Sequence, residues 1–214
     1  MMKAYFAGVP VFFRPFWMVY GFLAAVIILT YFRICTFTCK LRIEGVEFLT
    51  MYPAVIRAQW HQTFMGSMLF RASYRRDVWI NHPLTYMIPW YFIAKMVGIH
   101  RMIPGSTGHS GREAAEALVE ELKRGTVSTN ITPDGPGGPS RVLKKGVLHI
   151  AEQSGLPILP IRITMTNGLV TPSWDQKILP LPFVTSVLIQ FQKPIFVTAD
   201  NRTEMEAHIQ HALG

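Results

Sequence analysis

Apolar residues dominate the start of the chain and then fall into short clusters. Residues 15–32 form a run of eighteen residues without a charge, bounded by Arg14 and Arg33. As an α-helix this run would be about 27 Å long at about 1.5 Å per residue, close to the hydrocarbon thickness of a bilayer. The pattern predicts a membrane-anchoring segment over residues 1–38, followed by one α/β domain over residues 39–214.

Beyond residue 40, short β-type runs alternate with stretches of helical periodicity. This alternation is typical of a central mixed sheet flanked by helices. The predicted strands are residues 40–46, 54–60, 77–81, 126–132, 156–164 and 186–192. The predicted helices are residues 61–72, 84–97, 111–124, 142–154 and 202–213.

The third predicted helix has the clearest local signals. Ser110 and Glu113 have the spacing of a capping box, and Ala114, Leu118 and Leu122 repeat on one face. A loop rich in glycine and serine precedes it, so the exposed N–H groups of its first turn are a candidate anion site. A plain turn before the helix is the alternative.

The composition favours a membrane and an anionic partner. Charged residues make up 16% of the chain, below the roughly 25% of soluble domains. Lys and Arg outnumber Asp and Glu by 21 to 13, but they are scattered rather than in dense runs. We therefore expect a phospholipid surface or a phosphorylated molecule as partner, and no nucleic acid.

The metal-ligating residue types lack the spacing of a metal site. Cys35 and Cys39 stand alone at the end of the apolar segment, which excludes a disulfide framework and leaves them as small apolar fillers. His82, His100 and His109 include no helix-spaced pair. No metal is expected.

His61 is the first candidate for chemistry. It follows the apolar strand 54–60, and in open α/β sheets the ends of the strands border the ligand crevice. A neutral imidazole accepts a proton near pH 7, because its ordinary pKa is about 6.5. The alternative is a structural histidine that caps the following helix.

A second candidate is Asp134, in a turn with three glycines and three prolines between residues 131 and 141. Asp-Gly is ordinarily a turn former, and that interpretation remains open. Alternatively, the carboxylate orders a substrate hydroxyl while the neighbouring Arg141, Lys144 and Lys145 hold a phosphate.

The order and spacing of these two segments resemble the lysophospholipid and glycerol-phosphate acyltransferase superfamily. Its first motif is a histidine at a strand end, and residues 60–64 resemble it. Residues 132–161 resemble the third and fourth motifs, in a bacterial branch with Pro-Asp-Gly-Pro in the third. The resemblance covers roughly residues 40–195 and implies an acyltransferase-like fold.

The resemblance also implies roles for individual residues. His61 matches the catalytic base, and Asp134 matches the acidic residue of the third motif. Pro157 and Pro160 match the fourth motif. The candidate substrate-binding residues are Arg101, Ser106, Arg112, Gly135, Pro136, Arg141, Lys144 and Lys145.

Two features depart from the superfamily pattern. The residue five positions after His61 is Gly66, where the superfamily has the aspartate that orients the histidine. We expect Asp134 to take that role, with Glu113 as the second candidate. Arg101 is out of register with the basic residue of the second motif, and His82 is an alternative base.

The implied activity is transfer of a fatty acyl group from acyl-coenzyme A or acyl carrier protein to a hydroxyl of a lysophospholipid or related lipid, with direct attack of that hydroxyl. No other cofactor is expected. The implied location is the bacterial inner membrane, with the catalytic domain on the cytoplasmic side. Two alternatives remain: a catalytically inactive lipid-binding protein, and a lipid ester hydrolase, although the chain lacks a Gly-x-Ser-x-Gly motif. The pattern does not indicate an oligomeric state.

Overall fold

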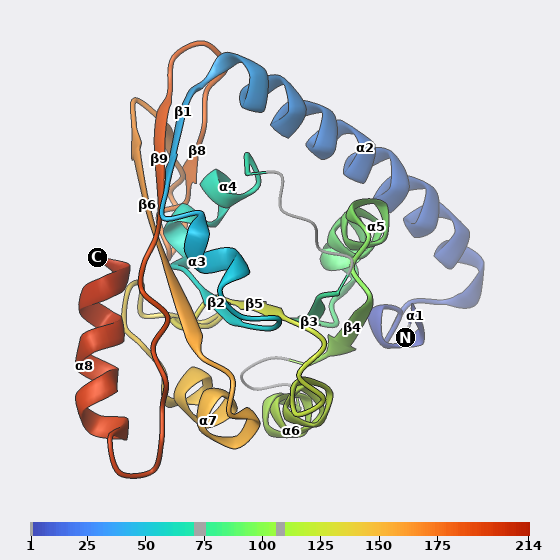
Figure 1. Cartoon of the computed structure of the whole chain (residues 1–214). Coiled ribbons are helices and arrows are strands. Elements are labelled where there is room, and N and C mark those ends of the chain that lie inside the picture. Colours follow the sequence, from blue (N-terminus) through green and yellow to red (C-terminus); the bar gives the residue numbers. More distant parts are fainter. Residues whose placement is uncertain (1, 71–75, 106–109) are drawn as a thin grey trace.

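A five-stranded mixed sheet forms the centre of the computed structural model, which describes residues 2–70, 76–105 and 110–214 (Figure 1). Only the contact between β6 and β9 is antiparallel; the other neighbours in this sheet run parallel. The strands, in spatial order, are β1 (Lys40–Glu44), β9 (Ser186–Phe191), β6 (Ile158–Thr166), β2 (Ile56–Ala58) and β5 (Thr129–Ile131). These five strands were predicted, and the sixth predicted strand, β3 (Val78–Asn81), is present outside this sheet.

Two smaller pairs of strands complete the β-structure. The parallel pair β3 (Val78–Asn81) and β4 (Arg101–Pro104) lies beside the open edge of β5, where Asp77 and Ser128 form a parallel bridge. The hairpin of β7 (Leu169–Val170) and β8 (Ile178–Leu179) follows β6. Strands β4, β7 and β8 had no alternating pattern long enough to predict them.

The helices follow the predicted order. The long ones are α2 (Arg14–Thr38), α5 (Ile88–Val97), α6 (Gly111–Leu122), α7 (Lys145–Ser154) and α8 (Arg202–Leu213). The single-turn helices are α1 (Met2–Tyr5), α3 (Glu47–Thr50), α4 (Phe64–Ser67) and the 3-10 turns η1 (Val11–Phe13), η2 (His61–Thr63) and η3 (Thr85–Met87). Within the described residues, the predicted helix over 61–72 is two short turns that end at Ser67, and its last two positions fall outside those residues.

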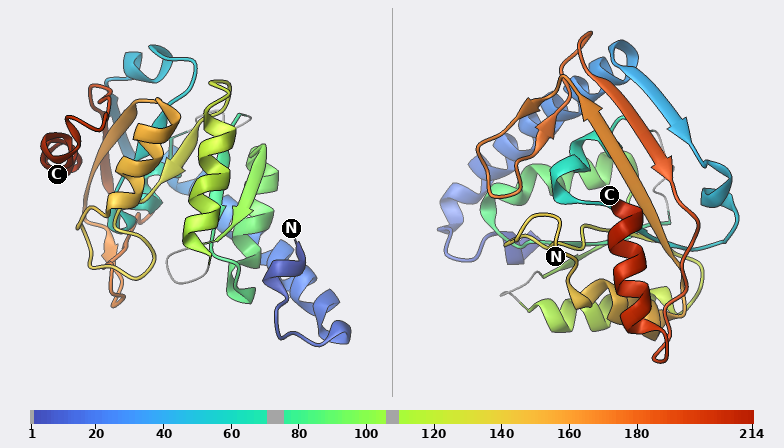
Figure 2. Two further views of the ribbon diagram at one scale, coloured as in Figure 1. Left: turned by 90° about the horizontal axis from the view of Figure 1, so that it is seen from below. Right: turned by 90° about the vertical axis from the view of Figure 1, so that its left-hand side faces the viewer.

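Two hydrophobic cores lie on opposite faces of the main sheet. One joins the sheet to α6, α7 and α8, and it includes the predicted stripe Ala114, Leu118 and Leu122. Figure 2 shows α8 crossing this face. The other core contains Phe32 and Cys35 from the end of α2, together with α4 and the outer strands. All three residues of β2 are buried, including Arg57 at its centre.

The capping box predicted at α6 was wrong. Ser110 occupies the N-cap position but adopts a left-handed backbone conformation, with φ of 51°, and its side chain makes no cap hydrogen bond. A capping side chain needs the extended backbone of an ordinary N-cap to reach the second or third N–H. The spacing of Ser110 and Glu113 was correct, but the backbone at Ser110 points its hydroxyl elsewhere.

Helix α2 is long and apolar enough to cross a membrane, by length and composition, over Val11–Thr38. It nevertheless packs on the protein, because it lies along α5 (Figure 1). A Cβ at Gly21 would lie 2.4 Å from Ile88 Cγ2, so glycine is what permits this close approach. The opposite side of α2 exposes large apolar residues, among them Phe16, Leu23 and Ile27.

A buried ion pair ties the main sheet to the β3–β4 pair. Arg57 on β2 donates to Asp77, which also accepts from Trp79 Nε1 at 2.9 Å. Burial raises the pKa of Asp77, and the Arg57 guanidinium counters part of that effect. Removing either partner would leave a buried charge uncompensated, which costs about 3–5 kcal/mol.

Candidate active site

Two parallel strands bring the predicted catalytic residues together. His61 follows the end of β2, and Asp134 follows the end of β5. Because β2 and β5 are adjacent and parallel, their carboxyl ends meet at one edge of the sheet. The 73 residues that separate His61 from Asp134 in the sequence therefore close to hydrogen-bond distance.

His61 and Asp134 form a dyad. The His61 Nδ1 atom lies 2.7 Å from Asp134 Oδ1. Asp134 is fully buried and also accepts from two backbone N–H groups, those of His61 at 3.3 Å and Arg141 at 3.3 Å. Glu113, the second candidate to orient His61, is exposed on α6. Asp134 is thus the carboxylate that contacts the imidazole, although it comes from another part of the chain than the superfamily's aspartate.

Thr132 completes a chain of three side chains. Its Oγ1 atom lies 2.9 Å from His61 Nε2, on the side of the ring away from Asp134. A carboxylate only accepts hydrogen bonds, so Nδ1 carries the proton of the neutral imidazole and Nε2 is left as the acceptor. The Thr132 hydroxyl then donates to Nε2.

The backbone around Asp134 is held in a tight turn. Gly135 has a φ of 65°, and its N–H donates to the carbonyl of Thr132 at 3.0 Å. The N–H of Lys144 donates to the carbonyl of Pro133 at 2.9 Å. A left-handed φ is costly for residues with a Cβ, so position 135 favours glycine. In the Asp-Gly pair, Gly135 therefore permits the turn while Asp134 contacts His61.

Helix α8 braces the same turn from outside. Gln210 uses both atoms of its amide, accepting from the N–H of Leu143 at 3.0 Å and donating to the carbonyl of Arg141 at 2.8 Å. The indole of Trp60, directly before His61, donates to the carbonyl of Gly214 at 2.9 Å. Both strand ends that carry the dyad are therefore fixed to α8.

The dyad opens into a pocket of about 300 Å³. Its apolar lining is mostly aromatic and sulfur-containing and comes from α4, η3, α5 and the β3–β4 pair. Its polar lining comes from the end of β3, from β5 and the residue after it, and from the β7–β8 hairpin. The apolar residues are Phe64, Met65, Trp79, Ile80, Met87, Trp90 and Met102. The polar residues include Asn81, His82, Asn130, Thr132 and Lys177. This combination suits a ligand with a long apolar part and a polar end.

The β7–β8 hairpin contributes two side chains to the pocket, Trp174 and Lys177. The Trp174 ring packs edge-on against His61, with ring centroids 5.4 Å apart. A Cβ at Gly138 would lie 2.6 Å from the Trp174 ring, so the indole packs directly against the backbone of the glycine-rich turn. Lys177 lines the same pocket and pairs with Asp175. Burial tends to raise the pKa of Asp175, but hydrogen bonds from Lys177 and Ser173 outweigh it and lower this pKa.

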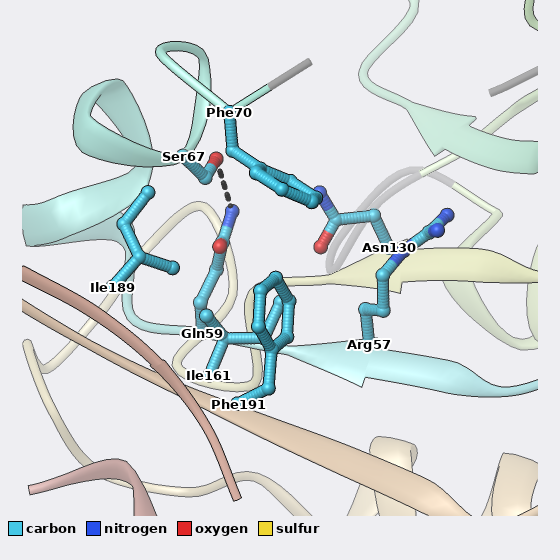
Figure 3. Close-up of a pocket in the computed structure, with 8 residues that line it drawn as sticks. All are labelled: Arg57, Gln59, Ser67, Phe70, Asn130, Ile161, Ile189 and Phe191. Carbon is cyan, nitrogen blue, oxygen red and sulfur yellow. Dashed lines mark hydrogen bonds between the residues drawn. The ribbon is translucent and has the colours of Figure 1, made fainter. Parts of the chain in front are cut away.

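A second, much smaller cavity of about 10 Å³ is shown in Figure 3. Gln59 donates to Ser67 at 2.9 Å, as Figure 3 shows. The carbonyl oxygens of Gln59 and Asn130 are buried and accept no hydrogen bond within the described part of the chain. This cavity holds at most a water molecule, so it is not a substrate site. Asn130 lines both cavities and separates them.

The predicted substrate-binding residues do not lie together. Arg101 pairs with Glu121, and Arg112 pairs with Glu116 on the exposed face of α6, away from the pocket lining. Pro136 lines the pocket. Ser106 falls outside the described residues.

The candidates beside the turn lie around the dyad rather than in the pocket. The guanidinium of Arg141 donates to Gln62 at 2.8 Å. The Lys144 side chain covers Gly135, and Lys145 begins α7. None of these three lines the pocket of the described chain, in which Lys177 supplies a cation.

Sequence reasoning missed three pocket residues that touch or face His61. Thr132 lies within the turn segment, two residues before Asp134, but its hydroxyl carried no signal separate from the strand end. Trp174 and Lys177 belong to a hairpin that was not predicted. The described residues include no group of three or more His, Cys, Asp or Glu side chains that could hold a metal ion. Of the histidines considered as ligands, His109 falls outside the described residues.

Comparison with known proteins identifies the fold. The 1-acyl-sn-glycerophosphate acyltransferase PlsC from Thermotoga maritima superposes with a TM-score of 0.57, over 99% of this chain and 92% of that one, at 19% sequence identity. The chain has an acyltransferase fold. This confirms the predicted mixed sheet with flanking helices and an apolar N-terminal helix.

Sequence comparison adds little beyond the fold. No protein-family model matches the chain. The protein RP090 of Rickettsia prowazekii, described as uncharacterized, is 31% identical over 100 residues. That match spans 47% of this chain and 45% of the relative's length. The assignment to the Pro-Asp-Gly-Pro branch therefore stays a prediction.

Proposed function

We propose that the chain is an acyltransferase that moves a fatty acyl group from an acyl thioester to a hydroxyl of a lipid acceptor. The observation that carries this proposal is the His61–Asp134 dyad beside a largely apolar pocket that His61 lines, within an acyltransferase fold. His61 Nε2 takes the proton of the attacking hydroxyl, and Asp134 holds the ring and stabilises the imidazolium that forms.

The pocket lining indicates how the substrates lie. The aromatic and methionine side chains contributed by α4, α5 and the β3–β4 pair contact the acyl chain, because burial of each methylene contributes about 0.8 kcal/mol. Lys177 faces the anionic group of the acceptor or donor. The acyl carbonyl then lies near His61, between these two parts.

The proposed acceptor is a lysophospholipid or related lipid, and the proposed donor is acyl-coenzyme A or acyl carrier protein. The exposed apolar side of α2 supports attachment to a membrane, for which we propose the bacterial inner membrane with the site on the cytoplasmic side. The alternative of an inactive lipid-binding protein does not explain why a buried carboxylate is matched to His61 Nδ1. A carboxylate that contacts Nδ1 is the arrangement that orients the imidazole of a general base.

The test is transfer of radiolabelled palmitoyl groups from coenzyme A and from acyl carrier protein to a panel of lysolipids, using the full-length protein in detergent. His61→Ala is expected to abolish transfer, whereas His208→Ala, an exposed histidine on α8, is the matched control and keeps it. Product that forms equally with His61→Ala would overturn the assignment of the base. Free fatty acid without acylated lipid would identify a hydrolase.

A further inference from the structure

The accepting nitrogen of the candidate base is already occupied by a hydroxyl of the chain itself. Thr132 Oγ1 lies 2.9 Å from His61 Nε2, and His61 Nδ1 lies 2.7 Å from Asp134. An acceptor hydroxyl that attacks directly needs the same nitrogen, so it would first have to displace Thr132. The hydroxyl, imidazole and carboxylate already have the order of a nucleophile, its base and the group that orients the base.

We propose that Thr132 is a catalytic nucleophile that carries the acyl group between donor and acceptor as an ester. This rests on the proposed function, since it names how the same site performs the transfer. Thr132 lines the 300 Å³ pocket together with His61, so a carbonyl bound there can reach both side chains.

The electrostatic setting activates this hydroxyl. Asp134 is fully buried and accepts hydrogen bonds from His61 and Arg141, which fixes the tautomer that leaves Nε2 as acceptor. The ring of Trp174 packs edge-on against the ring of His61. Asn130, two residues before Thr132, also lines the pocket and is the candidate hydrogen-bond donor to the oxyanion.

The reaction proceeds in two balanced half-reactions. In the first, Thr132 Oγ1 bonds to the thioester carbonyl carbon as its proton passes to His61 Nε2; the C–S bond then breaks, and the leaving sulfur takes that proton. In the second, the acceptor hydroxyl gives its proton to His61 Nε2 and bonds to the acyl carbon. The bond between the acyl carbon and Thr132 Oγ1 breaks, and Thr132 recovers a proton from the imidazolium.

Strand β5 offers a matched control for this hydroxyl. Thr129 lies on the opposite face of the strand, fully buried, and its hydroxyl has no hydrogen-bond partner in the described residues. Thr129→Val and Thr132→Val therefore make the same chemical change three residues apart. Thr132→Ser keeps a hydroxyl and tests whether Thr132→Val fails for lack of it.

The experiment follows exchange of radiolabelled coenzyme A into palmitoyl-coenzyme A in the absence of any acceptor. A covalent intermediate permits this exchange, whereas direct transfer does not. We expect exchange with the wild-type protein, Thr132→Ser and Thr129→Val, and at least a 1000-fold loss with Thr132→Val. A long-chain alkyl fluorophosphonate, which reacts with activated hydroxyls, is expected to label the peptide that contains Thr132 in the wild type and not in His61→Ala.

The outcomes separate the two proposals. Net transfer to a lysolipid without exchange and without labelling would overturn the role of Thr132 and leave the proposed function standing. Exchange that persists in Thr132→Val would also overturn it. Labelling of Thr132 without transfer to any lipid would support the nucleophile and overturn the acyltransferase assignment, because the acyl ester would then be released to water.

Discussion

The contact between Asp134 and His61 gives the sharpest prediction, and Asp134→Asn tests it. The substitution keeps the size of the side chain but replaces one acceptor oxygen with a donor amide. Asp134 accepts from three N–H groups: His61 Nδ1, the backbone of His61 and the backbone of Arg141. An asparagine cannot accept from all of them, so one donor must face another.

Either orientation of the asparagine is unfavourable. If its oxygen faces His61 Nδ1, its amide opposes the backbone N–H of Arg141, and an N–H left without a partner costs about 1–3 kcal/mol. If its amide faces Nδ1, the imidazole adopts the tautomer with the proton on Nε2, and the base is blocked. The same change in a serine protease triad lowers kcat about 10⁴-fold. We expect a similar loss here, equivalent to about 5 kcal/mol.

The assay is kcat/KM for transfer of radiolabelled palmitoyl groups at saturating donor, with thermal unfolding measured in parallel. Asp200→Asn, at an exposed position, is the matched control and is expected to leave both quantities unchanged. A rate for Asp134→Asn within tenfold of wild type, in a protein that still folds, would show that the observed dyad is not the catalytic arrangement.

Four further outcomes follow from single features of the fold. Gly66→Asp is expected to lower the free energy of unfolding by about 1–3 kcal/mol and to give no gain in activity, because a Cβ there would lie 2.8 Å from a β6 side chain; urea denaturation and the transfer assay measure this. Thr129→Val is expected to raise the free energy of unfolding by about 1 kcal/mol, since it removes a buried unpaired hydroxyl; a decrease would contradict this. Lys177→Ala is expected to raise KM for an anionic lysolipid about tenfold and not for a neutral one; equal effects on both would contradict a charge contact. The lowered pKa of Asp175 means that its contribution to stability is full above its ordinary value of 3.8 and is lost as the pH falls through the lowered value, so Trp174 fluorescence should change only below about pH 4.

The sequence predicted the main sheet because periodicity is a local property. The strand before His61 and the turn around Asp134 were each visible as short patterns, and the parallel order of β2 and β5 brings their ends together. The choice of Asp134 over Glu113 as the partner of His61 followed from the same logic. The sequence could not prove this choice, because the distance between the side chains of His61 and Asp134 depends on the register of β2 and β5.

The remaining site residues depend on contacts that leave no periodic signal. Trp174 and Lys177 reach the pocket only because a short hairpin folds back over the dyad. The basic residues beside Asp134 looked like a phosphate site, yet proximity in sequence places Lys144 over Gly135 rather than in the pocket. At Gly66, side chains of β6 occupy the space that a Cβ would need. This packing explains why an aspartate does not occur at that position.

Helix α5 lies between the apolar N-terminal helix and the pocket. One side of α5 presses Ile88 against Gly21 of α2, and the adjoining residues Met87 and Trp90 line the pocket, with Trp90 packed on Phe64. Closely packed elements transmit small displacements instead of absorbing them. The packing of α2 against α5 therefore links the position of the N-terminal helix to that of Met87 and Trp90 in the pocket wall.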